Sequence, residues 1–201
     1  MHPSARFQIE DREEMAALVR AAGFGTLVAQ TEAGLRAVHV PVLLREERLS
    51  FHVSRSNLVY RALMEGAEAL FVANGPHAYV SPDWYGTGGR VPTWSYVAVE
   101  LNGPVRALDE AALLALLADM SAEHEDRLAP KPSWTKESVN AERYDALVKA
   151  IGGFEMDIRE WRGTSKIDQD KPQEVRARIA EALEARGEAE MAALYALPRN
   201  D

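Results

Sequence analysis

The amino-acid sequence predicts a single α+β domain in which helices surround an antiparallel, barrel-like sheet. After an N-terminal helix come short runs of β-forming residues joined by brief turns, as in a meander. The last third has mostly helical patterns. A chain of 201 residues has the length of one ordinary domain. We therefore expect one domain over residues 1–201, with a helical C-terminal part from about 109–201.

Capping residues and apolar spacing place the elements of this domain. Asp11 stands at an N-cap position with Glu14 three residues later, and Gly23 follows the last helically spaced residue. Asn57 and Pro172 mark two further helix starts, and the helix after Pro172 is expected to be a single amphipathic one. The expected helices are 12–22, 57–63, 110–125, 142–151 and one beginning at 172, and the expected strands are 24–31, 35–44, 49–54, 69–73, 95–108 and 152–158.

Residues 75–94 are predicted to form a long loop. They contain three prolines, four glycines and four large aromatic residues. Loops of this kind on a β scaffold commonly carry functional sites. Trp84, Tyr85, Trp94 and Tyr96 would either stack on an aromatic cofactor or pin the loop to the barrel. The sequence does not separate these two roles.

Composition narrows the classes of function. The chain has 31 acidic and 23 basic residues, a net charge of −8. This charge argues against a broad nucleic-acid-binding face and leaves only a local basic patch open. The chain has no cysteine, which excludes disulfides, thiolate nucleophiles and cysteine-based metal sites. The sequence contains no Gly-x-Ser-x-Gly elbow, so it does not indicate a hydrolase.

Location and metal content are also predicted from what the sequence lacks. No apolar stretch approaches the roughly 20 residues that span a bilayer, and the N-terminus lacks the apolar core of a signal peptide. We expect a cytoplasmic protein that does not enter a membrane. The five histidines show no His-x-x-x-His spacing, so no metal site is expected.

Two polar clusters are candidate ligand sites. Ser54, Arg55, Ser56 and Asn57 gather where a strand leads into a helix start, and such donors suit a phosphate. Ordinary helix capping with a solvated arginine explains the same residues. In the segment 159–178, Lys166 could supply a second positive charge, although chemistry alone favours a solvated basic segment.

His39 lies in an apolar strand, within the run His39-Val40-Pro41. Such a backbone segment can lie beside a planar ring system, with His39 adding a side-chain hydrogen bond. A hydrogen-bonded histidine in the core is the more common arrangement, and the residues alone favour it.

The order of several motifs resembles that of a known family. Residues 75–85 and 91–96 are similar to the signature GPHAYxSxxWY…VPTWNY of the PaiB-type FMN-binding negative transcriptional regulators. The segments 24–28, 39–41 and 52–57 follow in the family's order, and 151–154 resembles its I-V-G-F element. The similarity spans roughly residues 1–195, and its central motif is long and specific.

This resemblance implies a split β-barrel fold related to the pyridoxamine-phosphate-oxidase-like proteins, with peripheral helices and a C-terminal helix. It also implies FMN as cofactor and a homodimer with FMN at its interface. In such relatives the first strand pair runs along the isoalloxazine and the following strand end holds the phosphate. The cofactor-binding residues that it implies are Ala37, Val38, His39, Val40, Ser54, Arg55, Ser56, Asn57, Thr93, Trp94, Tyr96, Lys166 and Gln169.

The sequence departs from the family pattern in three places. Leu58-Val59-Tyr60 replaces the usual Pro-Gln/His-Trp, and Ser95 stands where Asn is frequent. Residues 167–171 replace L-S-Q-N-R and add Asp168 and Asp170 near the expected phosphate. Two carboxylates there would oppose phosphate binding unless nearby lysines offset them.

The resemblance implies a negative regulator of transcription, although no helix-turn-helix is evident and the net charge does not favour DNA binding. Regulation through a partner protein, or through an effect of FMN on the dimer, fits the sequence as well. The alternative is an FMN-dependent oxidoreductase acting on a small molecule, in which the flavin supplies the hydride chemistry. A flavin carrier or a scaffold that has lost FMN is a third option. No catalytic residue is assigned, and the candidate proton donors are His39, His77 and Tyr96.

Overall fold

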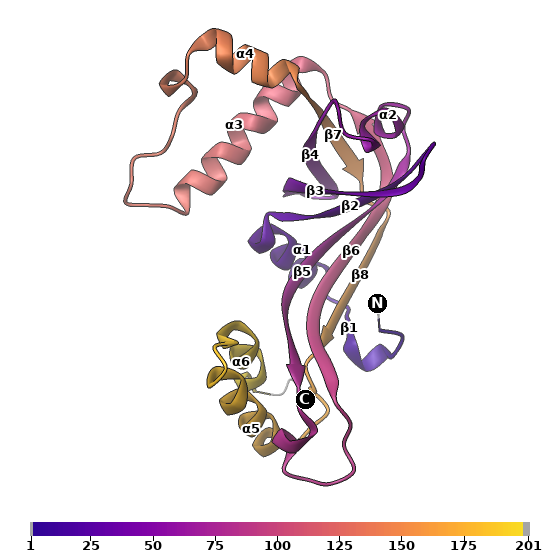
Figure 1. Ribbon diagram of the computed structural model, residues 1–201, viewed down its shortest axis with the longest axis vertical. Coiled ribbons are helices and arrows are strands. Elements are labelled where there is room, and N and C mark those ends of the chain that lie inside the picture. Colours follow the sequence, from indigo (N-terminus) through magenta and orange to yellow (C-terminus); the bar gives the residue numbers. More distant parts are fainter. Residues whose placement is uncertain (1, 199–201) are drawn as a thin grey trace. The chain divides into compact units, whose positions relative to one another are not determined.

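The structure, a computed structural model, describes residues 2–198 and has an antiparallel sheet with helices at its periphery (Figure 1). The α+β class expected from the sequence is confirmed. The strands are β1 (Gln8–Ile9), β2 (Phe24–Thr31), β3 (Gly34–Arg45), β4 (Arg48–Ser54), β5 (Glu68–Val80), β6 (Thr93–Ala107), β7 (Ile151–Asp157) and β8 (Glu160–Lys166). The helices are α1 (Arg12–Ala22), α2 (Val59–Met64), α3 (Glu110–Asp126), α4 (Ala141–Lys149), α5 (Gln173–Glu184) and α6 (Ala189–Ala196), with short 3-10 turns η1 (Ala5–Phe7), η2 (Pro82–Tyr85) and η3 (Lys136–Ser138).

Six of these strands close into a ring. The sheet follows the order β1-β8-β6-β5-β2-β3-β4-β7, and β6 also pairs with β7. In that pairing Val105 lies opposite Met156. The pairs therefore run from β6 through β5, β2, β3, β4 and β7 and return to β6. Closure of this kind leaves no free strand edge in the ring.

Gly103 makes this closure sterically feasible. A Cβ atom placed on Gly103 would lie 1.9 Å from the carbonyl oxygen of Asp157, at the end of β7. Any side chain would collide with that backbone, so the position requires glycine. Next to it, the Arg159 amide donates to the Asn102 carbonyl at 2.9 Å, which ties β6 to the chain that follows β7.

The chain divides into two compact units. Unit 1 consists of the described parts of 1–18, 74–99 and 162–201, and unit 2 consists of 19–73 and 100–161. Unit 2 holds the barrel segments. Unit 1 holds the ends of β5 and β6 together with β8, α5 and α6.

In unit 2, side-chain alternation sends one face of each strand into the barrel. Leu27 on β2 is fully buried and lies opposite Phe71, which is also buried, on β5. Phe51 and Phe154 stack inside with ring centroids 5.8 Å apart. Outside the barrel, α3 covers part of β3. There Leu43, Leu116 and Met120 form a buried cluster with Leu108 at its edge.

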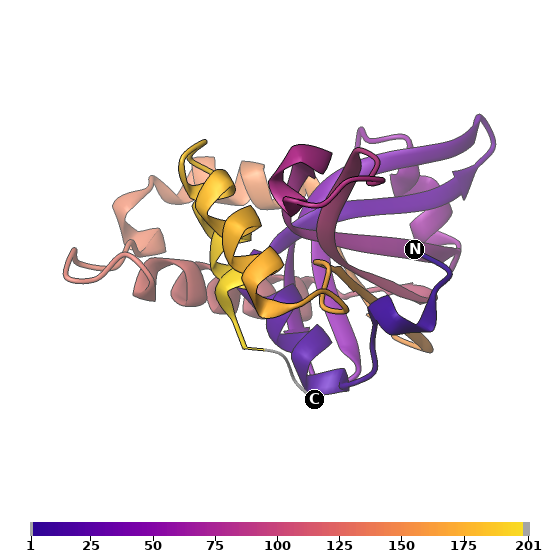
Figure 2. The ribbon, with the colours of Figure 1, turned by 90° about the horizontal axis from the view of Figure 1, so that it is seen from below.

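In unit 1, α5 and α6 lie side by side and pack on η2 and the end of β5 (Figures 1 and 2). Their shared core combines both helices with the strand. Its buried members are Ala78, Val80, Tyr85, Ile179, Leu183, Met191, Ala192 and Tyr195. The α5–α6 pair is thus an integral part of unit 1.

Three sequence predictions of local structure are wrong. Residues 75–80 belong to β5 rather than to a loop, because Ala78 and Val80 are buried in the core of unit 1. Residues 160–166 form β8 rather than a solvated basic segment, and the pairing with β1 explains this strand. The last helix is two helices, because Gly187 adopts φ +80° and ends the first.

His52 gives a prediction for the pH dependence of stability. Burial lowers the pKa of His52, and its Nδ1 atom is buried without a hydrogen-bond partner among the described residues. The unfolded chain therefore takes up a proton below pH 6.5 more readily than the folded chain. The contribution of His52 to the free energy of unfolding should be complete above pH 6.5 and should be lost as the pH falls below that value. The loss should amount to about a few tenths of a kcal/mol per pH unit. Urea denaturation at several pH values checks this. The free energy of unfolding of H52Q should fall less steeply with decreasing pH than that of the unaltered protein. Equal slopes for both proteins would contradict the assignment.

Candidate functional site

The outer face of β2, β3 and β5 in unit 2 is largely apolar and partly exposed to solvent. Thr26 lies opposite His39, and Val28 lies opposite Ala37. Phe24, which is 53% exposed, stacks on His39 with centroids 6.2 Å apart. The same face also carries Leu35, Leu70 and Val72. A contiguous apolar sheet face of this kind is typical of a surface that binds a ligand or another chain.

The four β3 residues expected beside the isoalloxazine do not share one face. Ala37 and His39 point outward, whereas Val38 and Val40 alternate to the opposite face and Val40 is buried. His39 Nδ1 lies 3.1 Å from Thr26 Oγ1. The histidine is therefore oriented and exposed, and its interpretation as a core residue is wrong. Only Ala37 and His39 offer side chains to a ligand on the outer face.

The expected phosphate cluster lies where β4 ends. Ser54 Oγ and Ser56 Oγ are 2.8 Å apart, and both residues are exposed. Asn57 Oδ1 accepts a hydrogen bond from the Val59 amide at 3.1 Å, at the start of α2. The Asn57 side chain thus caps the start of α2, while the hydroxyls of Ser54 and Ser56 stay accessible to a ligand.

The Arg55 side chain contacts other residues than Ser54 and Ser56. Its Nε donates to the Ile151 carbonyl at 3.0 Å, and its Nη1 donates to Tyr60 Oη at 2.8 Å. The guanidinium also lies over the Tyr60 ring, 5.5 Å from its centroid. These contacts fix the group between β7 and α2. None of its described hydrogen bonds joins it to Ser54 or Ser56.

In unit 1, Lys166 fixes the start of β6. Its Nζ donates to Thr93 Oγ1 at 2.5 Å and to the Trp94 carbonyl at 2.6 Å. The Trp94 side chain is 58% exposed and contacts the rings of His77 and Tyr79. Among the loop aromatics, Tyr85 is buried and Trp84 packs against the core of unit 1, so these two pin the loop.

The side chain of Gln169 forms hydrogen bonds with backbone groups. Its Nε2 donates to the carbonyls of Arg6 and Ser165 at 3.0 and 2.7 Å, and its Oε1 accepts from the Ile167 amide at 3.1 Å. Every polar atom of the side chain is thus engaged. Cofactor contacts by Thr93, Trp94, Tyr96, Lys166 and Gln169 remain predictions.

Asp168 accepts hydrogen bonds from two tyrosines within unit 1. Tyr85 Oη and Tyr195 Oη each donate to its Oδ2 at 2.7 Å, and Ser95 Oγ lies 2.6 Å from Tyr195 Oη. Burial, together with the Asp168 carboxylate, raises the pKa of both tyrosines, which keeps them protonated as donors. Asp168 itself has φ +53°, a conformation that non-glycine residues seldom adopt.

Asp170 is also occupied. Burial by itself would raise its pKa, but the hydrogen bond and charge of Lys171 outweigh that effect and the pKa is lowered. Arg6 adds an ion pair at 3.2 Å. Both carboxylates that the sequence set against phosphate binding thus have structural partners of their own.

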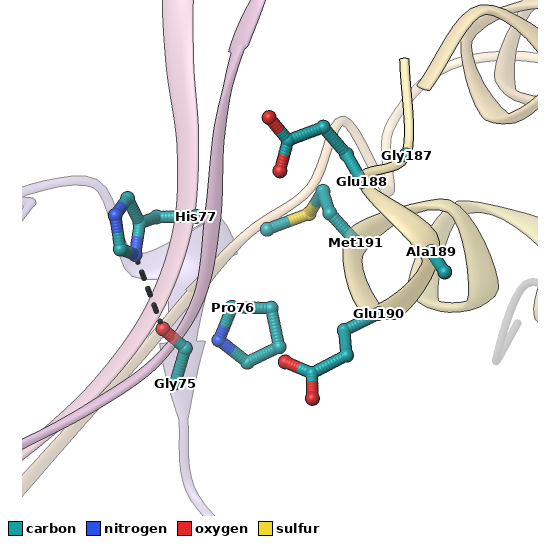
Figure 3. A pocket seen from close by; sticks show the side chains of 8 residues that line it. All are labelled: Gly75, Pro76, His77, Gly187, Glu188, Ala189, Glu190 and Met191. Carbon is teal, nitrogen blue, oxygen red and sulfur yellow. Dashed lines mark hydrogen bonds between the residues drawn. The ribbon is translucent and has the colours of Figure 1, made fainter. Parts of the chain in front are cut away.

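A shallow cleft with a volume of about 450 Å³ also lies in unit 1 (Figure 3). Pro76 faces the start of α6 across it, and Met191 extends toward the strand from the other side. Glu188 and Glu190 bring carboxyl groups to its rim, while the His77 ring lies on the other side of the strand. The cleft contains no fixed cation or buried polar group that would define a ligand.

Sequence reasoning missed the roles of Thr26, Ser95, Asp168 and Tyr195. The hairpin register could have identified Thr26, because it faces His39 across a short turn. No local signal indicates the other three. Ser95 and Tyr195 are 100 residues apart, and only the packing of α6 brings them together.

Comparison with known proteins identifies the family. Residues 1–160 match the family described as "Putative FMN-binding domain". The chain belongs to this family. It is also 25% identical over 182 residues to the "Protease synthase and sporulation protein PAI 2" of Bacillus subtilis, covering 89% of this chain and 86% of that protein. The PaiB-type resemblance is thereby confirmed.

Solved structures show the same fold. The conserved hypothetical protein Rv2991 of Mycobacterium tuberculosis superposes with a TM-score of 0.61 at 13% identity, over 86% of this chain and 94% of that one. The flavocytochrome Anf3 of Azotobacter vinelandii superposes with a TM-score of 0.60 at 14% identity, over 82% and 72% of the two chains. The FAD and heme binding protein of Mycobacterium smegmatis gives 0.58 at 18% identity, over 79% and 73%.

The fold is therefore a split β-barrel and the cofactor is FMN. Lys166, Asp168, Gln169 and Tyr195 lie beyond the residues that match the family. Within residues 2–198, no helix combines the length and apolarity needed to cross a bilayer. The same residues contain no cluster of His, Asp and Glu side chains suited to a metal ion.

The Asp168 network gives a prediction for stability. In D168A two buried tyrosine hydroxyls would lose their acceptor, which should cost about 2–4 kcal/mol in the free energy of unfolding. D168N keeps an acceptor and tolerates positive φ, so its loss should be smaller. Chemical denaturation measures both. D170N, which alters partly exposed ion pairs with Arg6 and Lys171, is the matched control and should change stability by less than about 1 kcal/mol. An equal effect of D168A and D170N would contradict the role of Asp168.

Proposed function

We propose that this chain is an FMN-binding regulator of the PaiB type that acts as a cytoplasmic homodimer and represses transcription. The similarity to the PAI 2 protein of B. subtilis carries this proposal, because it covers nearly the full length of both chains. The apolar outer face of unit 2 supports it, since an exposed face with Phe24 and Leu35 suits a covering ring system and a second protomer.

The isoalloxazine is proposed to lie on this outer face beside Ala37 and His39. The contact with Thr26 fixes the imidazole on this face, and the paired strands supply a largely apolar surface for the ring. Ser54 and Ser56 are proposed to bind the phosphate with their exposed hydroxyls. When bound, FMN supplies reversible hydride or electron transfer.

Titration of the flavin-free protein with FMN, followed by flavin fluorescence, tests this site. The double variant S54A/S56A removes two hydroxyl donors to a charged group and should weaken binding by about tenfold or more. The double variant S133A/S138A changes two exposed serines near η3 and should bind FMN like the unaltered protein. Equal affinities for all three proteins would exclude Ser54 and Ser56 from the site.

Repression is proposed to act through a partner protein or through the flavin-dependent dimer, because the net charge of −8 disfavours direct DNA binding. A promoter fragment should show no saturable binding at about 150 mM salt. Gel shift or fluorescence anisotropy with and without FMN checks this. Saturable binding that weakens steeply as salt rises would instead establish direct DNA recognition.

One observation favours the oxidoreductase alternative. His39 is exposed on the proposed flavin face and its Nδ1 is held by Thr26, which leaves Nε2 available to a substrate. An oxidoreductase should oxidise NAD(P)H or bleach its bound flavin on addition of a small reductant. Activity that disappears in H39Q while FMN remains bound would support this alternative.

A further inference from the structure

We propose that unit 2 contains a second ligand site, distinct from the flavin face, which binds a short apolar molecule that carries a carboxylate. The site is a cavity of about 180 Å³ between α2, the start of α3, the end of α4 and β7. The proposal does not depend on FMN binding or on repression.

One part of the cavity lining is apolar. Met64, Leu108, Leu113 and Val148 line it, together with Tyr60, whose ring packs edge-on against Phe154 at 5.7 Å. Leu113 and Val148 are buried, whereas Met64 is 49% exposed and stands at the surface. The cavity thus combines apolar side chains with polar groups, as small-molecule sites usually do.

Two consecutive glycines let the side chains that line the cavity approach the backbone of β7 closely. A Cβ atom on Gly152 would lie 2.6 Å from a ring carbon of Tyr60. A Cβ atom on Gly153 would lie 3.1 Å from Leu113 Cδ1 and 3.3 Å from Leu108 Cδ1. Both glycines belong to β7, so a strand without side chains forms one wall of the cavity.

Two cations without carboxylate partners line the same cavity. Arg55 is held by Ile151 and Tyr60, neither of which carries a negative charge. Lys149, at the end of α4, has no ion pair within the described part of the chain. A guanidinium that is already oriented loses less freedom when it binds a carboxylate. The positive charge of this pair is therefore available to a ligand.

Two acidic residues also line the cavity, and they bear on the class of ligand. Asp109 Oδ1 accepts from the Ala112 amide at 2.8 Å and so caps α3. Glu110 has no described partner. A simple carboxylic acid would use Arg55 and Lys149 alone. A free amino acid with an apolar side chain would place its ammonium group near Glu110 as well. Both ligands share a carboxylate on a short apolar chain.

Calorimetric titration of the full chain, with and without FMN, tests the site with three matched probes: 4-methylpentanoate, leucine and 4-methylpentanol. We expect saturable binding of 4-methylpentanoate or leucine, and binding of the neutral alcohol weaker by about tenfold or more. Preference for leucine identifies the amino acid, and preference for 4-methylpentanoate identifies the simple acid. Absence of saturation by both carboxylates, or equal binding of the alcohol, would overturn the proposal.

Variants locate the binding. R55Q and K149Q should each weaken carboxylate binding by about fivefold to tenfold. M64W should block the cavity from an exposed position without disturbing the core. R61Q removes a nearby guanidinium on α2 that already pairs with Glu32 and Glu65, so it should leave carboxylate binding unchanged. Unchanged binding in R55Q, K149Q and M64W would place the ligand elsewhere and refute the site. FMN affinity, measured on the same variants, reports separately on the flavin face.

Discussion

The pairing of β6 with β7 is the constraint on which the rest of unit 2 depends. It closes six strands into a ring, and Gly103 permits it because Asp157 approaches too closely for any side chain. In a closed ring each strand has one inward and one outward face, so alternate residues are committed to the core or to solvent. This commitment buries Val40 and leaves His39 on the surface that is proposed to receive the flavin.

Unit 1 is stabilised by a network of side-chain hydrogen bonds. Asp168 joins Tyr85 and Tyr195 through hydrogen bonds, and Tyr195 reaches Ser95. Two of these residues, Tyr85 and Ser95, lie within the residues that match the family, whereas Asp168 and Tyr195 lie beyond them. The C-terminal segment thus completes a core that begins within the matched residues. A carboxylate that would oppose phosphate binding if it were free has become a structural acceptor.

Arg55 shows how the structure separates residues that are adjacent in sequence. Ser54, Arg55 and Ser56 suggest one phosphate site by composition, yet consecutive side chains at a strand end point in different directions. The serine hydroxyls meet each other, while the guanidinium turns to Ile151 and Tyr60 and lines a separate cavity. This separation underlies the proposal of a second ligand site, and a cofactor contact by Arg55 stays a prediction.

Local signals in the sequence were enough to determine the helix from 12 to 22, the β2–β3 hairpin and the fold class. The motif at 75–96 was enough to identify the family and its cofactor. These features depend on caps, alternation and short-range turns, which a single segment encodes. Only the tertiary structure decided that 75–80 and 160–166 are strands, that Gly187 divides the last helix, and which partners Arg55 and Asp168 have. Those outcomes depend on contacts between residues far apart in the chain, and the free energy of such contacts overrides local preference.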